Sequence, residues 1–286
     1  MTHPLKIAVI ITLSCISISI GYIKYNKLTM NDIGLSTLSL IKMIRGDAVQ
    51  LNQLNESQIT SIAHQDWTTL LQRHVSVKGE VHYRGFLADQ FTLQKYLDKL
   101  SENVPGPSWS KEEQLAYWIN AYNAFTIQLI LKHYPLKSIK DISDGLPMIN
   151  SPWDIKFFKL GGVRFDLNTI EHQILRVRYQ EPRIHFAINC ASISCPRLRN
   201  EAYTATKLEA QLEDQAQEFI NDVDKNLITS RETQLSAIFN WFQSDFTKES
   251  DVLTYLKTYR PSLNVEHQVT YMEYNWRLNE QVIIDR

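Results

Sequence analysis

Apolar residues recur at helical spacing along much of this chain. Trp67, Leu70 and Leu71 share one face of a helix predicted from Asp66 to Val75. The spacing favours helices over strands as the main elements of the fold. The same pattern predicts helices around 93–100, over 207–219 and over 235–246.

The clearest predicted helix begins at Ser110. Ser110 and Glu113 match a capping box, in which each side chain satisfies a free backbone amide of the other residue. From Leu115 to Leu131 the sequence is apolar nearly all round, which is typical of a helix buried on most sides. Asn120 and Asn123 interrupt it and lie on one face. Because a buried unpaired amide costs about 1–3 kcal/mol, both should bond to another element or to a ligand.

Strands are predicted to be short and scattered. Gly161-Gly162 supplies the positive φ angles of a two-residue turn, so 157–165 is predicted to form a hairpin. Apolar patterns predict further strands at 79–86, 184–189 and 269–278. A capping-box variant, Asn168-x-x-Glu171, predicts a helix through Arg178 that ends before Pro182. The fold class is therefore α+β, a helix-rich single domain with a small sheet of short strands.

The N-terminus has a different pattern. The run from Ile7 to Ile23 contains no charge and has basic residues on both sides. Its length is at the lower limit for a membrane-spanning helix, whereas a basic start and a short apolar run are typical of a signal peptide. We interpret residues 1–28 as a signal peptide or signal anchor and favour an uncleaved anchor. A lipoprotein cut at Cys15 matches poorly and is a minor alternative.

This leader predicts export of the folded domain. Residues 29–58 are expected to form a membrane-proximal spacer and residues 59–286 the globular domain. We expect the protein to be bound to the bacterial inner membrane through its N-terminal helix, with the globular domain in the periplasm. If the leader is cleaved, we expect the protein to be released into the periplasm. The chain has 286 residues, with 30 Lys plus Arg against 31 Asp plus Glu. Such a balance gives no field that would attract nucleic acid.

The densest group of reactive side chains lies between Arg183 and Leu198, in the run RIHFAINCASISCPRL. If this run begins as a strand, His185 and Asn189 face one side and the intervening apolar residues the other. Contact between His185 and Cys190 would then require the chain to turn just after the strand.

A second histidine could reach Cys190 through the fold. His172 is predicted in the middle of the preceding helix, and its neighbour Glu171 points about a third of a turn away.

Four interpretations of Cys190 and Cys195 stay open. One cysteine is a nucleophile whose pKa is lowered by a histidine or by backbone amides. The two cysteines form a disulfide, which an oxidising compartment permits. They bind zinc with His172 and His185, although the spacing matches no standard zinc pattern. Finally, Cys190 is a small buried apolar group. The sequence has no Gly-rich phosphate loop after a strand and no HExxH, so neither a cofactor nor a metal site is predicted.

Four motifs in the same order resemble a known family. They are EEQLAYWINAYNAFTIQLIL, TIEHQILR, RIHFAINCASISCPRL and YNWRLN. Through them the chain, from about Trp67 to Asn279, is similar to the Domain of Unknown Function 547 family, which occurs in bacterial envelope proteins and plant proteins. The activity of that family is not established. The resemblance implies a site built from Trp118, Asn120, Tyr122, Asn123, Glu171, His172, His185, Cys190, Ser194, Cys195 and Pro196.

Two positions qualify the resemblance. Ala191 stands where the family commonly carries glycine, so the turn here is expected to need a less positive φ. The plant branch often has serine at the position of Cys195, which excludes a disulfide throughout the family. The resemblance therefore favours Cys190 as the functionally important thiol.

The hypothesis from the sequence is a cysteine-dependent hydrolase or acyl transferase. Cys190 attacks an acyl or amide carbon, His172 moves the proton, and Asn120 or Asn123 orients the base or holds the developing oxyanion. The remaining positions, His185, Glu171, Ser194 and Cys195, would line the pocket for an unidentified small-molecule or peptide substrate. The alternatives are a non-catalytic binding or scaffolding module, in which the same polar set fastens the core, and a protein active in thiol–disulfide exchange.

Overall fold

The computed structural model describes residues 51–56, 59, 61–143, 151–229, 231–247, 251–263 and 268–281. The predicted leader and most of the predicted spacer lie outside these residues. Within the described ranges, no helix combines the length and the apolar character needed to cross a membrane.

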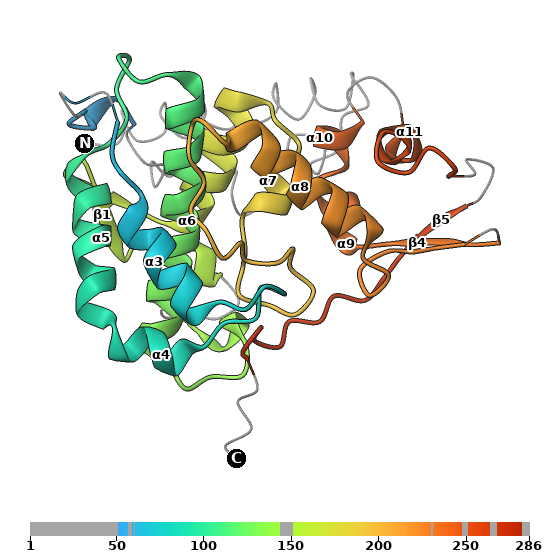
Figure 1. Ribbon diagram of the computed structural model, residues 1–286, viewed down its shortest axis with the longest axis horizontal. Helices are drawn as coiled ribbons and strands as arrows, with labels where there is room; N and C mark the ends of the chain where they lie inside the picture. Colours follow the sequence, from blue (N-terminus) through green and yellow to red (C-terminus); the bar gives the residue numbers. More distant parts are fainter. Residues whose placement is uncertain are drawn as a thin grey trace, which may run out of the picture.

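The first half of the described chain is helical. A short turn of 3₁₀ helix, η1 (Leu51–Gln53), precedes α3 (Gln65–His74), α4 (Tyr83–Ala88), α5 (Gln90–Glu102) and α6 (Lys111–His133). Helix α5 packs against both α3 and α6, and α4 contacts α6. Figure 1 shows α3, α4 and α5 together on one side of α6.

Helix α6 is the centre of this half. Its capping box is confirmed, because the Ser110 side chain accepts from the Glu113 amide and the Glu113 side chain accepts from the Ser110 amide. Acidic residues in the first turn and basic residues in the last complement the helix dipole. The helix ends at His133, where Tyr134 takes an extended conformation that suits the residue before Pro135. Its residues from Leu115 to Ile127 are all buried, as predicted.

The middle of the chain crosses the face of α6. Its π-helix packs along α6, and the two strands form the predicted hairpin, with positive φ at Gly161 and Gly162. In order, these elements are η2 (Ile139–Asp141), η3 (Pro152–Asp154), β1 (Phe158–Leu160), β2 (Val163–Phe165), the π-helix η4 (Thr169–Tyr179) and α7 (Ile184–Ala187).

The last part adds a second group of helices and a small sheet. Strand β4 pairs antiparallel with β3 and parallel with β5. The region predicted as one helix over 235–246 is two short helices, and the strand-like run 269–278 forms a strand only at its start. These elements are α8 (Leu208–Asn221), β3 (Leu227–Ile228), β4 (Thr233–Leu235), α9 (Ala237–Trp241), α10 (Gln243–Phe246), α11 (Val252–Lys257) and β5 (Val269–Tyr271).

The α+β class is confirmed, but two predicted strands are wrong. In the region 79–86, Val81 forms only isolated bridges and α4 begins at Tyr83. The run 184–189 begins as helix α7. The predicted capping role of Asn168 is also wrong, because its side chain makes no cap bond and instead donates to Asp154 at 2.7 Å.

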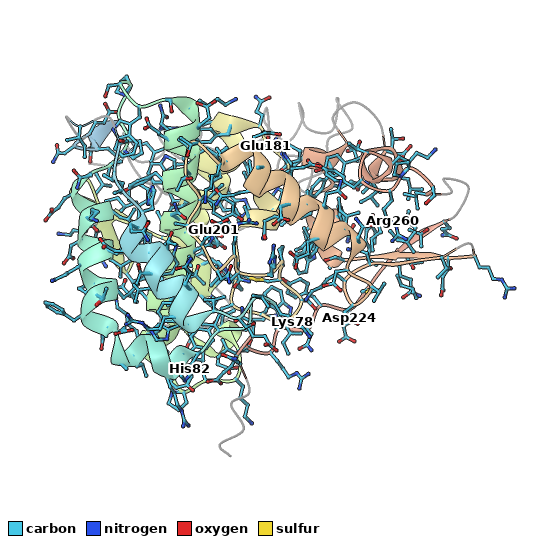
Figure 2. All side chains as sticks on the ribbon, viewed as in Figure 1. Lys78, His82, Glu181, Glu201, Asp224 and Arg260 are labelled. Atoms are coloured by element: carbon cyan, nitrogen blue, oxygen red, sulfur yellow. A yellow bond between two sulfur atoms is a disulfide. The ribbon has the colours of Figure 1, made fainter. Side chains whose placement is uncertain are left out.

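The buried apolar residues form two clusters. The first surrounds α6 and takes in α3, α5, β1 and η4. The second joins the end of α8 to β4, α9, α10 and α11. Trp276 is partly buried and packs against both clusters. Figure 2 shows side chains filling the space between these ribbons.

Candidate functional site

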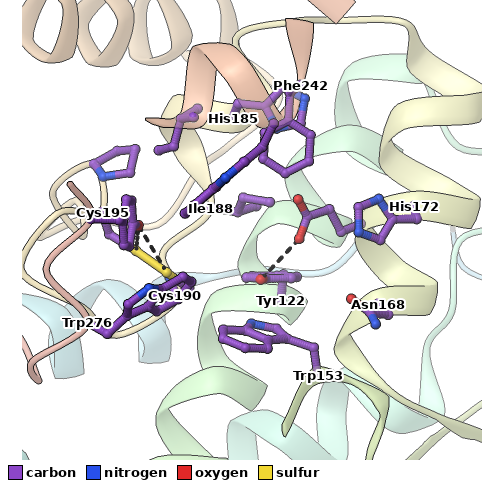
Figure 3. A pocket seen from close by; sticks show the side chains of 15 residues that line it. Tyr122, Trp153, Asn168, His172, His185, Ile188, Cys190, Cys195, Phe242 and Trp276 are labelled. Atoms are coloured by element: carbon purple, nitrogen blue, oxygen red, sulfur yellow. Dashed lines mark hydrogen bonds between the residues drawn. A yellow bond between two sulfur atoms is a disulfide. The ribbon is translucent and has the colours of Figure 1, made fainter. Parts of the chain in front are cut away.

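A cavity of about 180 Å³ lies between the two clusters. Its wall comes from α6, η3, η4, α7, α9, the turn after α7 and the C-terminal segment, so distant parts of the chain meet around it (Figure 3). The lining residues are Tyr122, Trp153, Asn168, Glu171, His172, His185, Ile188, Cys190, Cys195, Pro196, Ile238, Trp241, Phe242, Tyr274 and Trp276.

The π-helix η4 supplies two neighbouring polar side chains to this cavity. Glu171 and His172 both line it. A π-helix closes hydrogen bonds from residue i to i+5 and is therefore wider than an α-helix, so consecutive residues are separated by a smaller angle. The two side chains, predicted about a third of a turn apart, both reach the cavity. Such helices occur frequently at functional sites.

Helix α7 delivers His185 to the cavity. Because this segment is helical, the strand argument that placed His185 and Asn189 on one face does not apply. His185 lines the cavity, whereas Asn189 turns its amide into the following loop, donating to the Pro196 carbonyl at 2.7 Å and accepting from the Ala191 amide at 2.8 Å. These bonds hold the turn that carries both cysteines.

Ala191 occupies the left-handed region of this turn, with φ of 60°. The expectation that alanine here would need a less positive φ is wrong. The methyl group is completely buried, and the bond to Asn189 fixes the backbone in this conformation. Conformations of this kind cost a non-glycine residue about 1–2 kcal/mol, and they persist only where the surroundings impose them.

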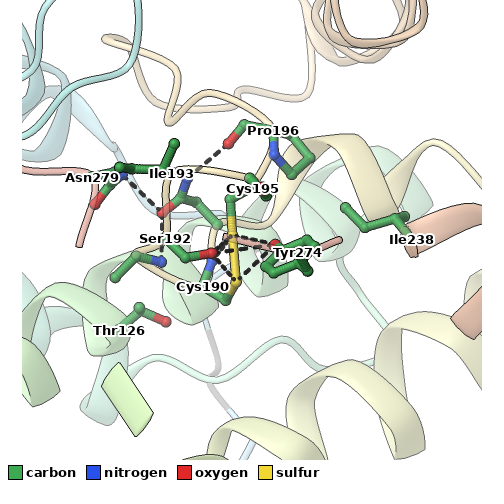
Figure 4. Close-up of a disulfide and its surroundings, with 12 residues drawn as sticks. Thr126, Cys190, Ser192, Ile193, Cys195, Pro196, Ile238, Tyr274 and Asn279 are labelled. Atoms are coloured by element: carbon green, nitrogen blue, oxygen red, sulfur yellow. Dashed lines mark hydrogen bonds between the residues drawn. A yellow bond between two sulfur atoms is a disulfide. The ribbon is translucent and has the colours of Figure 1, made fainter. Parts of the chain in front are cut away.

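Cys190 and Cys195 are joined by a disulfide, with their Cα atoms 6.3 Å apart (Figure 4). Of the four interpretations of these cysteines that the sequence left open, the structure therefore agrees with the disulfide. Cys190 is partly exposed, while only 4 % of Cys195 is accessible. Both line the cavity, and Cys195 also borders a second, polar hollow on the other side of the turn, whose rim includes Lys78 and Asp224 (Figure 2).

Polar hydrogens surround the sulfur of Cys195. The Cys190 amide donates to it at 3.0 Å, and the Tyr274 and Ser192 hydroxyls contact it at 3.1 and 3.3 Å. The same two hydroxyls lie 3.4 and 3.3 Å from the Cys190 sulfur. Each hydroxyl has one proton, so these contacts are alternatives between which the hydroxyls can rotate.

A charged network closes the side of the cavity near α7 and α10. Arg176 donates two hydrogen bonds to Asp245, at 2.5 and 2.9 Å, and His185 Nε2 lies 2.7 Å from the same carboxylate. Burial by itself would raise the pKa of Asp245, but the hydrogen bonds from His185 and Arg176 hold that pKa well below its usual range. The ring of His185 stacks on Phe242, with centroids 3.9 Å apart.

The network also sets the state of His172. Arg176 lies 3.1 Å from His172 Nδ1, and because an arginine can only donate, Nδ1 is the acceptor. Burial lowers the pKa of His172, with the charges of Arg176 and His185 contributing in the same direction against the opposing effect of Glu171. His172 is therefore a neutral imidazole near pH 7, with its proton on Nε2.

Four residues predicted for the site are not among those that line the cavity: Trp118, Asn120, Asn123 and Ser194. Asn120 donates to the Tyr203 carbonyl at 2.8 Å and accepts from the Tyr203 amide, and Asn123 bonds in the same way to Ala187 and Asn189. Their amides thus fasten two loops to α6, and neither side chain reaches the cavity where an oxyanion would form. Ser194 accepts from the amide of Asn275 at 2.9 Å, which ties the turn to the C-terminal segment.

The structure adds several residues that the sequence did not identify as site residues. Asp245 and Arg176 are separated by 69 positions, and no local motif relates them. Trp153, Trp241 and Phe242 come from short elements outside the four motifs. Tyr122 was named through the resemblance, and Tyr274 and Trp276 belong to the fourth motif, so those three carried a signal.

The described part of the chain contains no group of three or more His, Cys, Asp or Glu side chains arranged to hold a metal ion.

Comparisons with known proteins identify one relationship. Residues 107–220 match a family model described as "Protein of unknown function, DUF547". This span contains the first three of the four motifs and the residues from Tyr122 to Cys195 that line the cavity, whereas the fourth motif lies beyond it. No curated protein and no solved structure matches the chain.

Proposed function

Residues 107–220 belong to the DUF547 family, and we propose that the chain is an exported envelope protein in which Cys190 and Cys195 form a reversible dithiol–disulfide pair. The observation that carries this proposal is the set of donors around the Cys195 sulfur. Hydrogen bonds to a charged form favour that form, so the amide and the two hydroxyls would stabilise a Cys195 thiolate. A stabilised thiolate is the better leaving group in exchange.

The two cysteines would have different roles. Cys190 is the partly exposed residue of the pair and Cys195 is only 4 % exposed, so we assign the Cys190 sulfur as the one that an incoming thiol attacks from the cavity. A substrate thiolate attacks Cys190 Sγ, the S–S bond breaks, and its electron pair leaves on Cys195 Sγ. A second substrate thiolate then attacks the substrate sulfur of the mixed disulfide and releases Cys190. The substrate dithiol loses two electrons and two protons, and the cysteine pair gains them.

Export agrees with this chemistry. The uncharged run Ile7–Ile23 between basic residues supports a signal peptide or a membrane anchor. A disulfide persists in an oxidising compartment such as the bacterial periplasm. We therefore place the globular domain in the periplasm, either bound to the inner membrane through the N-terminal helix or released after cleavage.

A cysteine-dependent hydrolase or acyl transferase is the second candidate, and it requires the reduced pair. The favouring observation is that His172 and Glu171 line the same cavity as Cys190. To accept the thiol proton of a reduced Cys190, His172 would have to release Nδ1 from the Arg176 hydrogen bond, because Nε2 already carries the proton. Asn120 and Asn123 are not part of this version, because neither residue lines the cavity.

The test uses the full-length chain with Cys15→Ala, so that only the pair is measured. We equilibrate the protein in buffers with an increasing ratio of oxidised to reduced glutathione and quench the exchange with acid. The free thiols are then alkylated, and the mass of the protein is measured by mass spectrometry. As the buffer becomes more oxidising, the number of alkylated thiols in the pair should fall from two to none in a single two-electron transition. The protein should stay folded throughout. Cys195→Ala should accumulate a glutathione adduct on Cys190, and Cys190→Ala should form little adduct on Cys195.

Two outcomes would count against the exchange proposal. If the disulfide is reduced only when the protein unfolds, its role is structural. The alternative of a non-catalytic binding or scaffolding module would then be favoured. If the reduced protein instead forms a stable adduct between Cys190 and an acyl probe, and His172→Asn abolishes that adduct, the second candidate is favoured.

A further inference from the structure

Six aromatic side chains form much of the cavity wall. They are Tyr122, Trp153, Trp241, Phe242, Tyr274 and Trp276. Trp276 is central, because its ring lies 5.6 Å from Trp153, 5.6 Å from Trp241 and 4.5 Å from Tyr274, measured between centroids. The wall therefore presents several ring faces, whose quadrupoles attract cations.

Two protein cations already lie over rings of this wall. Lys140 Nζ is 4.6 Å from the centroid of Trp276, and the Arg176 guanidinium is 5.1 Å from that of Phe242. Both distances are in the range of a cation–π interaction. Neither Lys140 nor Arg176 is among the residues that line the cavity.

The cavity also contains a buried acid. Glu171 is only 7 % exposed, and its carboxylate accepts a hydrogen bond from the Tyr122 hydroxyl at 3.2 Å (Figure 3). Among the described residues, no lysine, arginine or histidine forms an ion pair with it. Its neighbour His172 accepts from Arg176 and is neutral, so it does not supply the missing positive charge.

A buried carboxylate is stable only when it is paired or well hydrogen-bonded. Here one phenol donates to it, while the aromatic walls exclude anions and favour cations. Exposed Trp241 and partly exposed Trp153 and Trp276 form the outer part of the wall, and Tyr122 and Glu171 are the more deeply buried part. The arrangement has the two features of an ammonium-binding cage, namely ring faces and an acid.

We propose that this cavity binds a compact organic cation, a primary or quaternary ammonium group placed against Glu171 and the rings of Trp276 and Tyr274. The volume is many times the roughly 10–15 Å³ that one water needs, so a head group of several heavy atoms fits. The same chemistry occurs in free small amines and in the head groups of amine-bearing lipids. This inference goes beyond the exchange proposal and does not depend on it, because no cysteine is required for the cage.

The test is a titration of the full-length protein with choline and with its uncharged carbon isostere, followed by tryptophan fluorescence and calorimetry. Choline should bind at least about tenfold more tightly, which corresponds to about 1.4 kcal/mol. Glu171→Gln keeps the shape but removes the charge, and should reduce that preference about tenfold. Glu112→Gln removes an exposed carboxylate from the start of α6 and should leave the preference unchanged.

A second arm separates the sources of the ammonium group. Vesicles of phosphatidylcholine should compete with free choline if a lipid head group enters the cavity, whereas vesicles of phosphatidylglycerol should not. Failure of vesicle competition with intact choline binding would assign the site to free amines.

Equal affinity for choline and its isostere in the wild-type protein would overturn the proposal, and so would an unchanged preference in folded Glu171→Gln. If Glu171→Gln does not fold, Trp276→Leu replaces it and should weaken choline binding about tenfold. Choline binding is measured on the oxidised wild-type protein and the exchange reaction by the glutathione titration, so failure of the exchange proposal and failure of the cage are distinguished.

Discussion

His64 is a buried titratable residue remote from the cavity. Its imidazole is 8 % exposed, and Nδ1 lies 2.7 Å from the Tyr96 hydroxyl. Burial, together with the charge of Lys99, lowers its pKa from 6.5 to about 4. As the pH falls, His64 takes up a proton near pH 6.5 in the unfolded chain but only near pH 4 in the folded protein. Stability contributed by neutral His64 is therefore complete above about pH 6.5 and is lost as the pH falls towards about 4.

We predict that the free energy of unfolding falls by about 2–3 kcal/mol between pH 7 and pH 4 because of this residue. Urea denaturation at several pH values measures it. His64→Gln should flatten the profile, whereas His133→Gln, at an exposed position, should leave the slope as in the wild type. Some slope should remain in His64→Gln, because the lowered pKa of His172 acts in the same direction. A wild-type profile that is flat across this window would contradict the assignment.

At the level of single residues, the sequence predicted the chemistry of the site better than its geometry. Glu171, His172, His185, Cys190 and Cys195 all line one cavity. Their type and local density were visible in the motifs. Which polar groups are already satisfied was not visible, because that depends on partners far away in the chain. The amide of Asn120, for example, is occupied by the backbone of a residue 83 positions further on.

Among the elements, the contact between α3 and α4 depends on a glycine. Gly85 lies inside α4, and a Cβ added there would be 2.8 Å from Cε1 of His74 and 2.7 Å from Nδ1 of His82. His74 cannot move freely, because it is buried and its Nε2 is held by Asp89 at 2.6 Å. The glycine thus allows the two helices to approach closely.

We predict that Gly85→Ala destabilises the protein by up to about 2 kcal/mol. Alanine is the better helix former by about 1 kcal/mol, but overpacking of this kind typically costs about 1–3 kcal/mol. Gly106→Ala is the matched control, because its Cβ would meet only the Glu56 side chain, at 3.2 Å and beyond. That variant should stay within about 0.5 kcal/mol of the wild type in chemical denaturation. A stabilised Gly85→Ala would show that helix propensity outweighs the contact.

Long elements were predictable and short ones were not, for a physical reason. The helix that begins at Ser110 has a cap and many turns of pattern, so its sequence determines it. The run from Ile184 to Ala187 is only one turn long and buried on all sides, and such a run has no periodicity that separates helix from strand. Its packing against α8 selects the helix. The other wrong strand prediction, 79–86, also fell on a short run, in which only Val81 forms bridges before α4 begins at Tyr83.

At the scale of the whole molecule, the C-terminal segment connects the two apolar clusters. Tyr274 belongs to the second cluster and Leu278 to the first, four residues apart. Between and beyond them the backbone bonds to three other loops: Ile193 donates to Arg277 at 2.8 Å, Leu278 to Lys137 at 2.8 Å and Val81 to Asn279 at 2.9 Å. The segment also supplies Trp276 to the cavity, so the site exists only when both clusters are assembled.

This connection predicts that the clusters unfold together. Leu278 is buried, and replacing such a leucine by alanine costs about 2–5 kcal/mol. We expect Leu278→Ala to cost about 2 kcal/mol or more, and to lower the hydrogen-exchange protection of the slowest amides in α6 and in α11 by the same free energy. Val223→Ala, at a position that is 69 % exposed, should change neither. If the amides of α6 lost protection while those of α11 kept theirs, the clusters would be independent folding units. If the clusters were independent, the cavity between them would open whenever either cluster unfolded. A ligand that binds only the closed cavity would then stabilise both clusters.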